Sequence, residues 1–152
     1  MWRTARPDED DVLIEMCLEL NREDPGPLPV SPEQMRQTLA VLQREPSRGR
    51  AVVLDVDQQP VGYALLIAFW SNELGGEVCE VDELFVAIKH RNQGHGRSLF
   101  AAIERGDLWP IPAVAIALGV TPGNSRARQM YERAGFVAVG VSMVRRLPST
   151  VR

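Results

Sequence analysis

The sequence has few cysteines and no long hydrophobic run. Its two cysteines, Cys17 and Cys79, form no CxxC pair and belong to no spacing typical of metal ligands. We therefore expect a reducing compartment, no disulfide framework and no metal. The longest apolar stretch, about residues 61–70, is far shorter than the roughly 20 residues that a membrane-spanning helix needs, so we expect no association with a membrane.

The amino terminus and the net charge exclude two further classes of protein. Acidic residues closely follow Arg3, which is not the pattern of a secretory signal, so we expect a cytoplasmic protein. The formal net charge is −3, whereas a dedicated nucleic-acid binder normally carries a basic face. We therefore expect no nucleic-acid partner.

The length and composition predict one globular domain. The chain has 152 residues, of which 45% are hydrophobic and 24% are charged, and it contains no repeat or low-complexity segment. We expect a single domain over residues 1–152 with its core in about residues 2–146. The hydrophobic periodicity and the turn residues predict strands at 2–6, 51–56, 61–70, 78–86, 113–120 and 136–145, and helices at 7–23, from Ser31 to about Leu42, 96–105 and 124–134.

The predicted element order is β-α-α-β-β-β-α-β-α-β, an α/β (α+β) fold with a mixed, mostly antiparallel central sheet flanked by helices. The strand, helix and strand over residues 78–120 imply one parallel pair of strands. Residues 113–120 are almost wholly apolar, which is typical of a strand buried on both faces. We expect the chemistry at the carboxyl end of the strand that finishes near Val86.

The turn after Val86 has the features of an anion site. Gly94 and Gly96 let the backbone approach an anion, and the N–H groups that open the following helix form a cradle for a pyrophosphate. A solvated, glycine-containing helix start is the alternative interpretation. Leu99 stands where a dinucleotide fingerprint has its third glycine, and no Gly-Lys-Ser/Thr follows, so neither a Rossmann site nor a P-loop fits.

Two segments carry a resemblance to a known family. Residues 91–96, Arg-Asn-Gln-Gly-His-Gly, resemble the Arg/Gln-x-x-Gly-x-Gly/Ala signature of the GNAT N-acetyltransferase superfamily. About 30 residues later, Asn124 opens a segment that resembles the family's Asn-x-x-Ala-x-x-x-Tyr-x-x-x-Gly-Phe, with Tyr131 at the tyrosine. Both segments occur in the family's order and spacing, so the resemblance implies a GNAT-like domain that binds acetyl-coenzyme A as acyl donor.

The resemblance also implies which residues hold the coenzyme. Its pantetheine arm lies along the strand before the turn, and its pyrophosphate lies on the amides of residues 93–97. Arg91, His95 and Arg97 add positive charge. Asn124 contacts the pantetheine in this family, although it also has the position of a helix cap. The full predicted set is Leu84, Phe85, Val86, Arg91, Asn92, Gln93, Gly94, His95, Gly96, Arg97, Asn124 and Tyr131.

The resemblance makes Tyr131 the general acid that protonates the departing thiolate, whereas helical periodicity alone predicts a core residue. The base is one of the carboxylates of the strand at 78–86. Strand alternation puts Glu80 and Asp82 on the face of Leu84 and Glu83 on the other, so we rank Glu80 and Asp82 equally and Glu83 behind them. A bulge in the strand would reverse these faces.

These residues predict an N-acetyltransferase that moves an acetyl group from acetyl-coenzyme A to a primary amine by direct transfer. The acids near the transfer point favour a cationic acceptor, either a small molecule or a lysine or amino-terminal amine of a peptide. A non-catalytic acyl-coenzyme A sensor of the same fold is the alternative. Many members of the family are dimers, so a homodimer is also expected. Phe69 and Trp70 are assigned either to the acceptor pocket or to the core.

Overall fold

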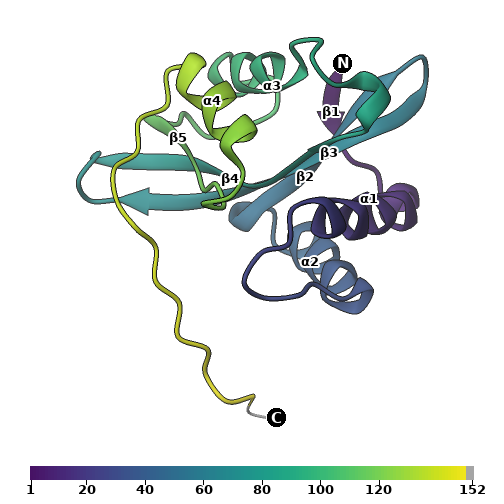
Figure 1. Cartoon of the computed structure of the whole chain (residues 1–152), viewed down its shortest axis with the longest axis horizontal. Helices are drawn as coiled ribbons and strands as arrows, with labels where there is room; N and C mark the ends of the chain where they lie inside the picture. Colours follow the sequence, from purple (N-terminus) through teal and green to yellow (C-terminus); the bar gives the residue numbers. More distant parts are fainter. Residues whose placement is uncertain (150–152) are drawn as a thin grey trace.

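The structure, a computed structural model, describes residues 1–149. Its strands and helices follow the predicted order as far as the fourth helix (Figure 1). The strands are β1 (Trp2–Thr4), β2 (Gly49–Val56), β3 (Gln59–Ser71), β4 (Gly76–Val86) and β5 (Ala115–Leu118); the helices are α1 (Asp10–Glu23), α2 (Pro32–Arg44), α3 (His95–Glu104) and α4 (Ser125–Arg133).

One five-stranded sheet, in the order β1-β2-β3-β4-β5, organises the domain. Neighbouring strands are antiparallel from β1 to β4, and β4 and β5 are parallel, as predicted. Helices α1 and α2 cover one face of the sheet, and α3 and α4 cover the other (Figure 1). The single α/β domain with a mixed sheet is therefore confirmed, and no helix within residues 1–149 has the length and apolar character needed to cross a membrane.

Local sequence signals explain several helix starts. Ser31 Oγ accepts a hydrogen bond from the Gln34 N–H at 3.1 Å, and Gln34 Oε1 accepts one from the Ser31 N–H at 2.7 Å. This reciprocal capping box satisfies two N–H groups at the start of α2.

Before α1, the buried Glu9 accepts hydrogen bonds from Arg3, which also bridges to Asp55 at 2.9 Å. The Arg3 hydrogen bonds hold the pKa of Glu9 at about 2, so this ion-pair network fastens β1 to β2 at neutral pH.

A β-bulge interrupts β4. Leu65 of β3 pairs with Glu83, but the next residue, Leu66, pairs with Val81, so Asp82 is the extra residue. The strand therefore changes face at Asp82. The predicted arrangement of faces is wrong for this reason, with consequences for the acids described below.

The edge strand and the C-terminal segment also differ from the predictions. β5 covers only Ala115–Leu118, and its residues are half-buried rather than buried on both faces, because within the described chain β4 alone pairs with it. The strand predicted for residues 136–145 is absent. Phe136 packs on the core, and residues 137–149 then leave the domain as an extended chain without regular secondary structure. This segment has strand-like alternation but no neighbouring strand to pair with.

Candidate acyl-coenzyme A site

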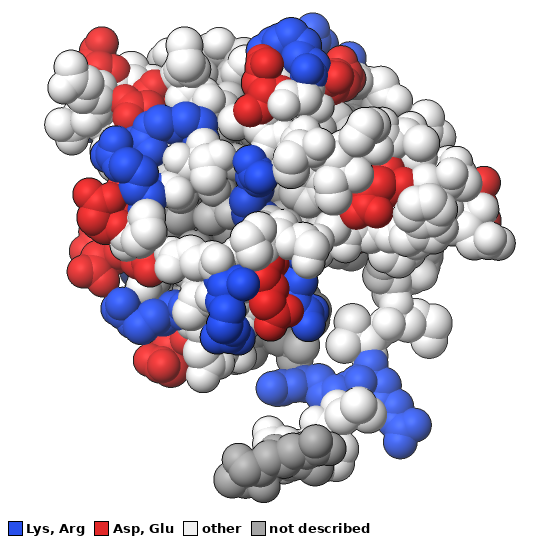
Figure 2. Space-filling model, turned by 180° about the vertical axis from the view of Figure 1, so that it is seen from behind, with Lys and Arg blue, Asp and Glu red and all other residues white. Residues whose placement is uncertain are grey.

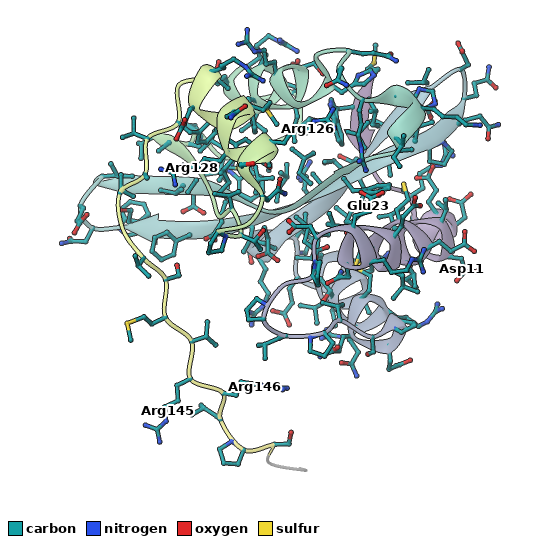
Figure 3. All side chains as sticks on the ribbon, in the orientation of Figure 1. Asp11, Glu23, Arg126, Arg128, Arg145 and Arg146 are labelled. Carbon is teal, nitrogen blue, oxygen red and sulfur yellow. The ribbon has the colours of Figure 1, made fainter. Side chains whose placement is uncertain are left out.

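A pocket of about 700 Å³ lies where the end of β4, the start of α3, the end of α1 and helix α4 meet. Two of its lining residues, Glu23 of α1 and Arg126 of α4, are labelled in Figure 3. Most of the predicted coenzyme residues line it: Leu84, Phe85, Val86, Arg91, Asn92, Gly94, His95, Gly96, Arg97, Asn124 and Tyr131. Gln93, Glu80, Asp82 and Glu83 are not among the lining residues. The two sequence motifs therefore meet in one cavity.

The turn before α3 leaves backbone amides free at the pocket. Asn92 and Gly94 both have a left-handed backbone, with φ of 60° and 79°, and α3 begins at His95. The first helical N–H groups have no partner one turn earlier, and the Ser98 N–H is the first to donate, to the Gly94 carbonyl. A methyl group placed on Gly94 would meet no atom within 4 Å. The turn thus presents unpaired N–H groups and the positive end of α3 to open space.

Gly96 has a different role from Gly94. A methyl group placed on Gly96 would come within 3.1 Å of the Met130 side chain, so this glycine allows α3 and α4 to pack closely. The absence of a side chain at Gly96 therefore lets the two helices that line the pocket pack against each other. At Gly94, the absence of a side chain leaves the backbone amides of the turn unobstructed.

The structure pairs Arg91, one of the predicted charged residues, with groups of the protein itself. Arg91 donates to the Val86 carbonyl at 2.6 Å and to the Glu23 carboxylate at 2.5 Å, and its guanidinium lies 5.6 Å from the centre of the Phe85 ring. Arg91 therefore braces the end of β4 against α1. Burial lowers the pKa of His95, and the positive charges of the amino terminus and His90 lower it further. A lowered pKa disfavours the charged imidazolium, and the predicted contribution of charge from His95 stays a prediction.

The cations that surround the turn come mainly from α3 and α4. Arg97 donates to the Arg133 carbonyl at 3.2 Å, and Arg126 donates to Asn92 Oδ1 at 3.0 Å. Arg126 and Arg133 were not predicted from the sequence, because nothing in their spacing indicates that α4 lies across the turn. Together with Arg97 they make this end of the pocket suited to an anion.

β4 and β5 separate at the bulge. Their parallel pairing runs from Val78 with Ala115 to Val81 with Leu118, and no later pair is present in the described chain. Beyond Val81, β4 continues to pair with β3 but exposes its other edge to the pocket. An extended ligand can pair with that edge through backbone hydrogen bonds.

The bulge rearranges the three strand acids. Glu80 pairs with Ile67 and Glu83 pairs with Leu65, and both partners pack in the core under α1 and α2, so both acids face that side. Leu84 instead packs with the core under α3 and α4. The prediction that Glu80 shares a face with Leu84 is therefore wrong, and Asp82 lies at the bulge itself.

The environments of Asp82 and Glu83 differ. Asp82 is exposed to solvent, yet the surrounding protein partly desolvates its carboxyl group and raises its pKa. Glu83 is half-buried, and Tyr63 donates a hydrogen bond of 2.7 Å to its Oε2. Burial raises the pKa of Glu83, opposed by the Tyr63 hydrogen bond and assisted by the negative charge of Asp82.

Tyr131 lies in the wall of the pocket beside a pair of phenylalanines. Its ring centre is 6.3 Å from that of Phe100 and 5.9 Å from that of Phe136, so it is both a core residue and a pocket residue. Burial raises its pKa, and the charge of Asp24 raises it further. The phenol therefore keeps its proton at neutral pH.

Asp24, which was not predicted, joins the end of α1 to the loop before α4. Its carboxylate accepts hydrogen bonds from Thr121 Oγ1 at 2.6 Å and from Asn124 Nδ2 at 2.9 Å. Asn124 Oδ1 accepts from the Ala127 N–H at 3.1 Å, so Asn124 is a helix cap as the residue pattern suggested. Asp24 and Asn124 are 100 positions apart, and no local signal could have paired them.

Comparison with known proteins agrees with this geometry. A model described as the acetyltransferase (GNAT) family matches residues 14–136. No curated protein matches the chain significantly.

Solved structures share the fold at low sequence identity. A possible acetyltransferase from Clostridium difficile 630 has a TM-score of 0.81 and 20% identity, with 99% of this chain and 98% of that chain covered. An integron cassette protein, HFX_CASS3, from the mobile metagenome of Cole Harbour Salt Marsh has a TM-score of 0.76 and 24% identity over 98% and 91%. The ribosomal-protein-alanine N-acetyltransferase of Brucella melitensis biovar Abortus 2308 has a TM-score of 0.70 and 17% identity over 97% and 99%.

The electrostatic contact between Asp24 and Tyr131 can be measured directly. Since the chain has two tyrosines, ultraviolet titration of the phenolate in the parent and in Tyr131→Phe assigns the Tyr131 transition. Asp24→Asn removes a negative charge that raises the pKa, so the Tyr131 midpoint should move to lower pH. Asp57→Asn, in the turn between β2 and β3, removes the same charge elsewhere and is the control. Equal midpoints in the two variants would contradict the site geometry.

Proposed function

The chain belongs to the GNAT acetyltransferase family, and on this premise we propose that it transfers an acetyl group from acetyl-coenzyme A to a primary amine by direct transfer. The observation that carries the proposal is the meeting of both family motifs in one pocket, at the point where β4 and β5 separate.

The pocket residues fit a coenzyme with a diphosphate and an extended arm. The free amides between Gly94 and Arg97 suit the diphosphate, with Arg97, Arg126 and Arg133 near it. The open edge of β4 at residues 84–86 suits the amide groups of the pantetheine arm. When bound, the coenzyme supplies an acetyl group as a thioester, and the protein orients it and handles the protons.

We assign Tyr131 as the general acid. Its phenol lines the pocket and its raised pKa keeps the proton available for the sulfur that leaves. A direct transfer needs a proton donor at this atom, because a thiolate formed in a desolvated pocket is poorly stabilised. The aromatic packing with Phe100 and Phe136 fixes the direction of the ring.

We assign Glu83 as the general base, with Asp82 and Glu80 as the alternatives. The hydrogen bond from Tyr63 to Oε2 fixes the orientation of the Glu83 carboxylate, which as the base would accept a proton from the acceptor ammonium. Glu83 immediately precedes Leu84, a pocket residue, and its raised pKa makes it a stronger base than an ordinary carboxylate. The bulge supports this assignment over the prediction from simple alternation.

The acceptor is proposed to be cationic. Asp24 lines the α1 side of the pocket beside Glu23, which is paired with Arg91, and Glu80 and Glu83 face the same side of the sheet. This arrangement opposes the arginines of α3 and α4, so the pocket has a basic end for the coenzyme and an acidic end for an amine. Candidate acceptors are polyamines, aminoglycosides, and the lysine side chain or amino terminus of a peptide.

Gly94→Glu should abolish binding of acetyl-coenzyme A, because a carboxylate would fill the cradle and repel phosphate. Isothermal titration calorimetry measures the affinity. Gly75→Glu is the matched control, since Gly75 also has a left-handed φ of 69° and open space around it but lies in the turn between β3 and β4. Retained affinity in Gly94→Glu, or equal loss in both variants, would reject the cradle.

Tyr131→Phe should lower kcat by roughly 100-fold with little change in coenzyme affinity, because it removes the proton donor but keeps the aromatic packing. The release of free thiol is followed with a panel of amines, and calorimetry gives the affinity. An undiminished kcat would reject Tyr131 as the acid. Binding without turnover of any amine by the parent protein would favour the non-catalytic sensor.

The pH dependence of kcat/KM should identify the base, because activity falls as the base becomes protonated. Glu83→Gln should remove the acidic limb of the profile. Tyr63→Phe should move that limb to higher pH, since the Tyr63 hydrogen bond lowers the pKa of Glu83, and Asp82→Asn should move it to lower pH. Glu80→Gln is the control. A limb that disappears in Asp82→Asn or Glu80→Gln instead would assign the base to that residue.

A further inference from the structure

The carboxylate of Asp24 joins two elements that lie far apart in the sequence. Asp24 ends α1, where its N–H donates to the Leu20 carbonyl at 2.9 Å. Its Oδ1 accepts a hydrogen bond from Thr121 Oγ1 at 2.6 Å, and its Oδ2 accepts one from Asn124 Nδ2 at 2.9 Å. Both oxygens are therefore engaged by the loop that leads from β5 to α4. Hydrogen bonds to an ionised carboxylate are stronger than those between neutral groups.

The hydrogen bond to Asn124 leads directly to the start of α4. While Asn124 Nδ2 donates to Asp24, its Oδ1 accepts from the Ala127 N–H and caps the helix. The carboxylate therefore fixes the orientation of the capping amide. Tyr131 lies one turn beyond Ala127 on the same helix face, and both residues line the pocket. A shift at the cap is consequently carried to the tyrosine ring within a single helical turn.

The end of α1 spans the two sides of the pocket. Within the described chain, β4 and β5 pair no further than Val81 with Leu118, so strand pairing does not hold the two sides together beyond that point. Glu23, labelled in Figure 3, accepts from Arg91 at 2.5 Å on the side of β4. Asp24, the next residue, holds the side of α4. Two adjacent carboxylates thus set the separation of the two sides.

We propose that Asp24 is a positioning residue for the transfer reaction, which holds α4 so that the Tyr131 phenol faces the end of β4. The inference rests on the proposed role of Tyr131 as the general acid. A proton donor has to lie within hydrogen-bond reach of the departing sulfur, so a small displacement of α4 lowers the rate. Asp24 acts on the reaction through Asn124 and Tyr131, by hydrogen bonds.

Two substitutions separate the hydrogen bonds of Asp24 from its charge. In Asp24→Asn, the amide oxygen can still accept from Asn124, and the amide nitrogen can donate to the Thr121 hydroxyl, which is both donor and acceptor. This variant keeps the connection to the loop and loses only the charge. Asp24→Ala loses both acceptors.

Steady-state kinetics of thiol release test the role. Asp24→Ala should lower kcat by roughly 10-fold or more, because a small misplacement of a catalytic group is enough for a loss of this size. Its affinity for acetyl-coenzyme A, measured by calorimetry, should change little, since Arg91 braces the turn that leads into α3. Asp24→Asn should recover most of the lost kcat. Equal losses in the two variants would overturn the proposal, as would an unchanged kcat with a raised KM for the amine in Asp24→Ala.

A double-mutant cycle shows whether Asp24 acts through Tyr131. The proton donor is already missing in Tyr131→Phe, so the addition of Asp24→Ala should lower kcat no further. Losses that multiply would mean that Asp24 acts independently of Tyr131 and would overturn the proposal.

Asp11→Ala is the matched control, because it also removes an aspartate from α1. The Asp11 side chain is 87% exposed and pairs with Arg36 at 3.2 Å on the surface, and Figure 3 labels it far from the pocket. Figure 2 shows acidic and basic side chains interspersed over the face seen from behind, so surface charge is mixed rather than concentrated there. Asp11→Ala should leave kcat unchanged. A loss in Asp11→Ala equal to that in Asp24→Ala would assign the effect to charge at a distance and overturn the proposal.

Hydrogen exchange tests the contact without turnover. The amides of residues 127–131 should exchange about 10-fold faster in Asp24→Ala than in the parent or in Asp24→Asn, because the cap of α4 is released. Thr121→Val removes one donor and preserves the side-chain shape, and it should produce a smaller increase; it decides the question if Asp24→Ala does not fold. Unchanged exchange would overturn the positioning contact alone, whereas a parent that binds acetyl-coenzyme A and acetylates no amine would overturn the proposed function.

Discussion

The functional architecture depends on one departure from regular pairing, the bulge at Asp82. It ends the contact between β4 and β5 at Val81 and Leu118 while the pairing of β4 with β3 continues. In a sheet, the backbone N–H and C=O groups of an interior strand are hydrogen-bonded along both of its edges. An interior strand with one free edge therefore presents N–H and C=O groups that need hydrogen-bond partners. The pocket opens at that edge, and the turn that leads into α3 follows soon after β4 ends.

The same bulge sets the electrostatics of the pocket. Because the strand changes face at Asp82, Glu80 shares with Glu83 the face toward α1 and Tyr63, on the side where Glu23 and Asp24 lie. The arginines of α3 and α4 remain on the other side of β4. An anionic ligand and a cationic ligand can therefore approach the separated strands from opposite directions, each meeting charge of the opposite sign. Without the bulge, alternation would have put Glu80 on the face of Leu84, toward α3 and α4, whereas Glu83 faces away from Leu84 in either case.

Signals that act over a few residues were sufficient to predict much of the site. The glycines at 94 and 96 and the capping residue Asn124 are signals of local backbone geometry, whereas Tyr131 was assigned through the resemblance to the GNAT family; the structure brings all four into one pocket. The bulge was not predicted, because the single phase shift that one extra residue makes in the alternation is not distinctive over so short a strand.

The remaining misses arise from contacts between distant segments. Asp24 meets Asn124 across 100 positions, and the strand-like residues after Phe136 have no neighbour within the described domain. A sequence pattern indicates which side chains are suited to burial, but not which segment buries them. The apolar sequence of β5 predicts an interior strand and the alternation after Phe136 predicts a half-buried one, yet within residues 1–149 neither segment gains a further strand beside it. The predicted last strand failed for this reason: alternation shows that a segment is suited to a strand, but a strand forms only where a neighbouring edge accepts its backbone hydrogen bonds.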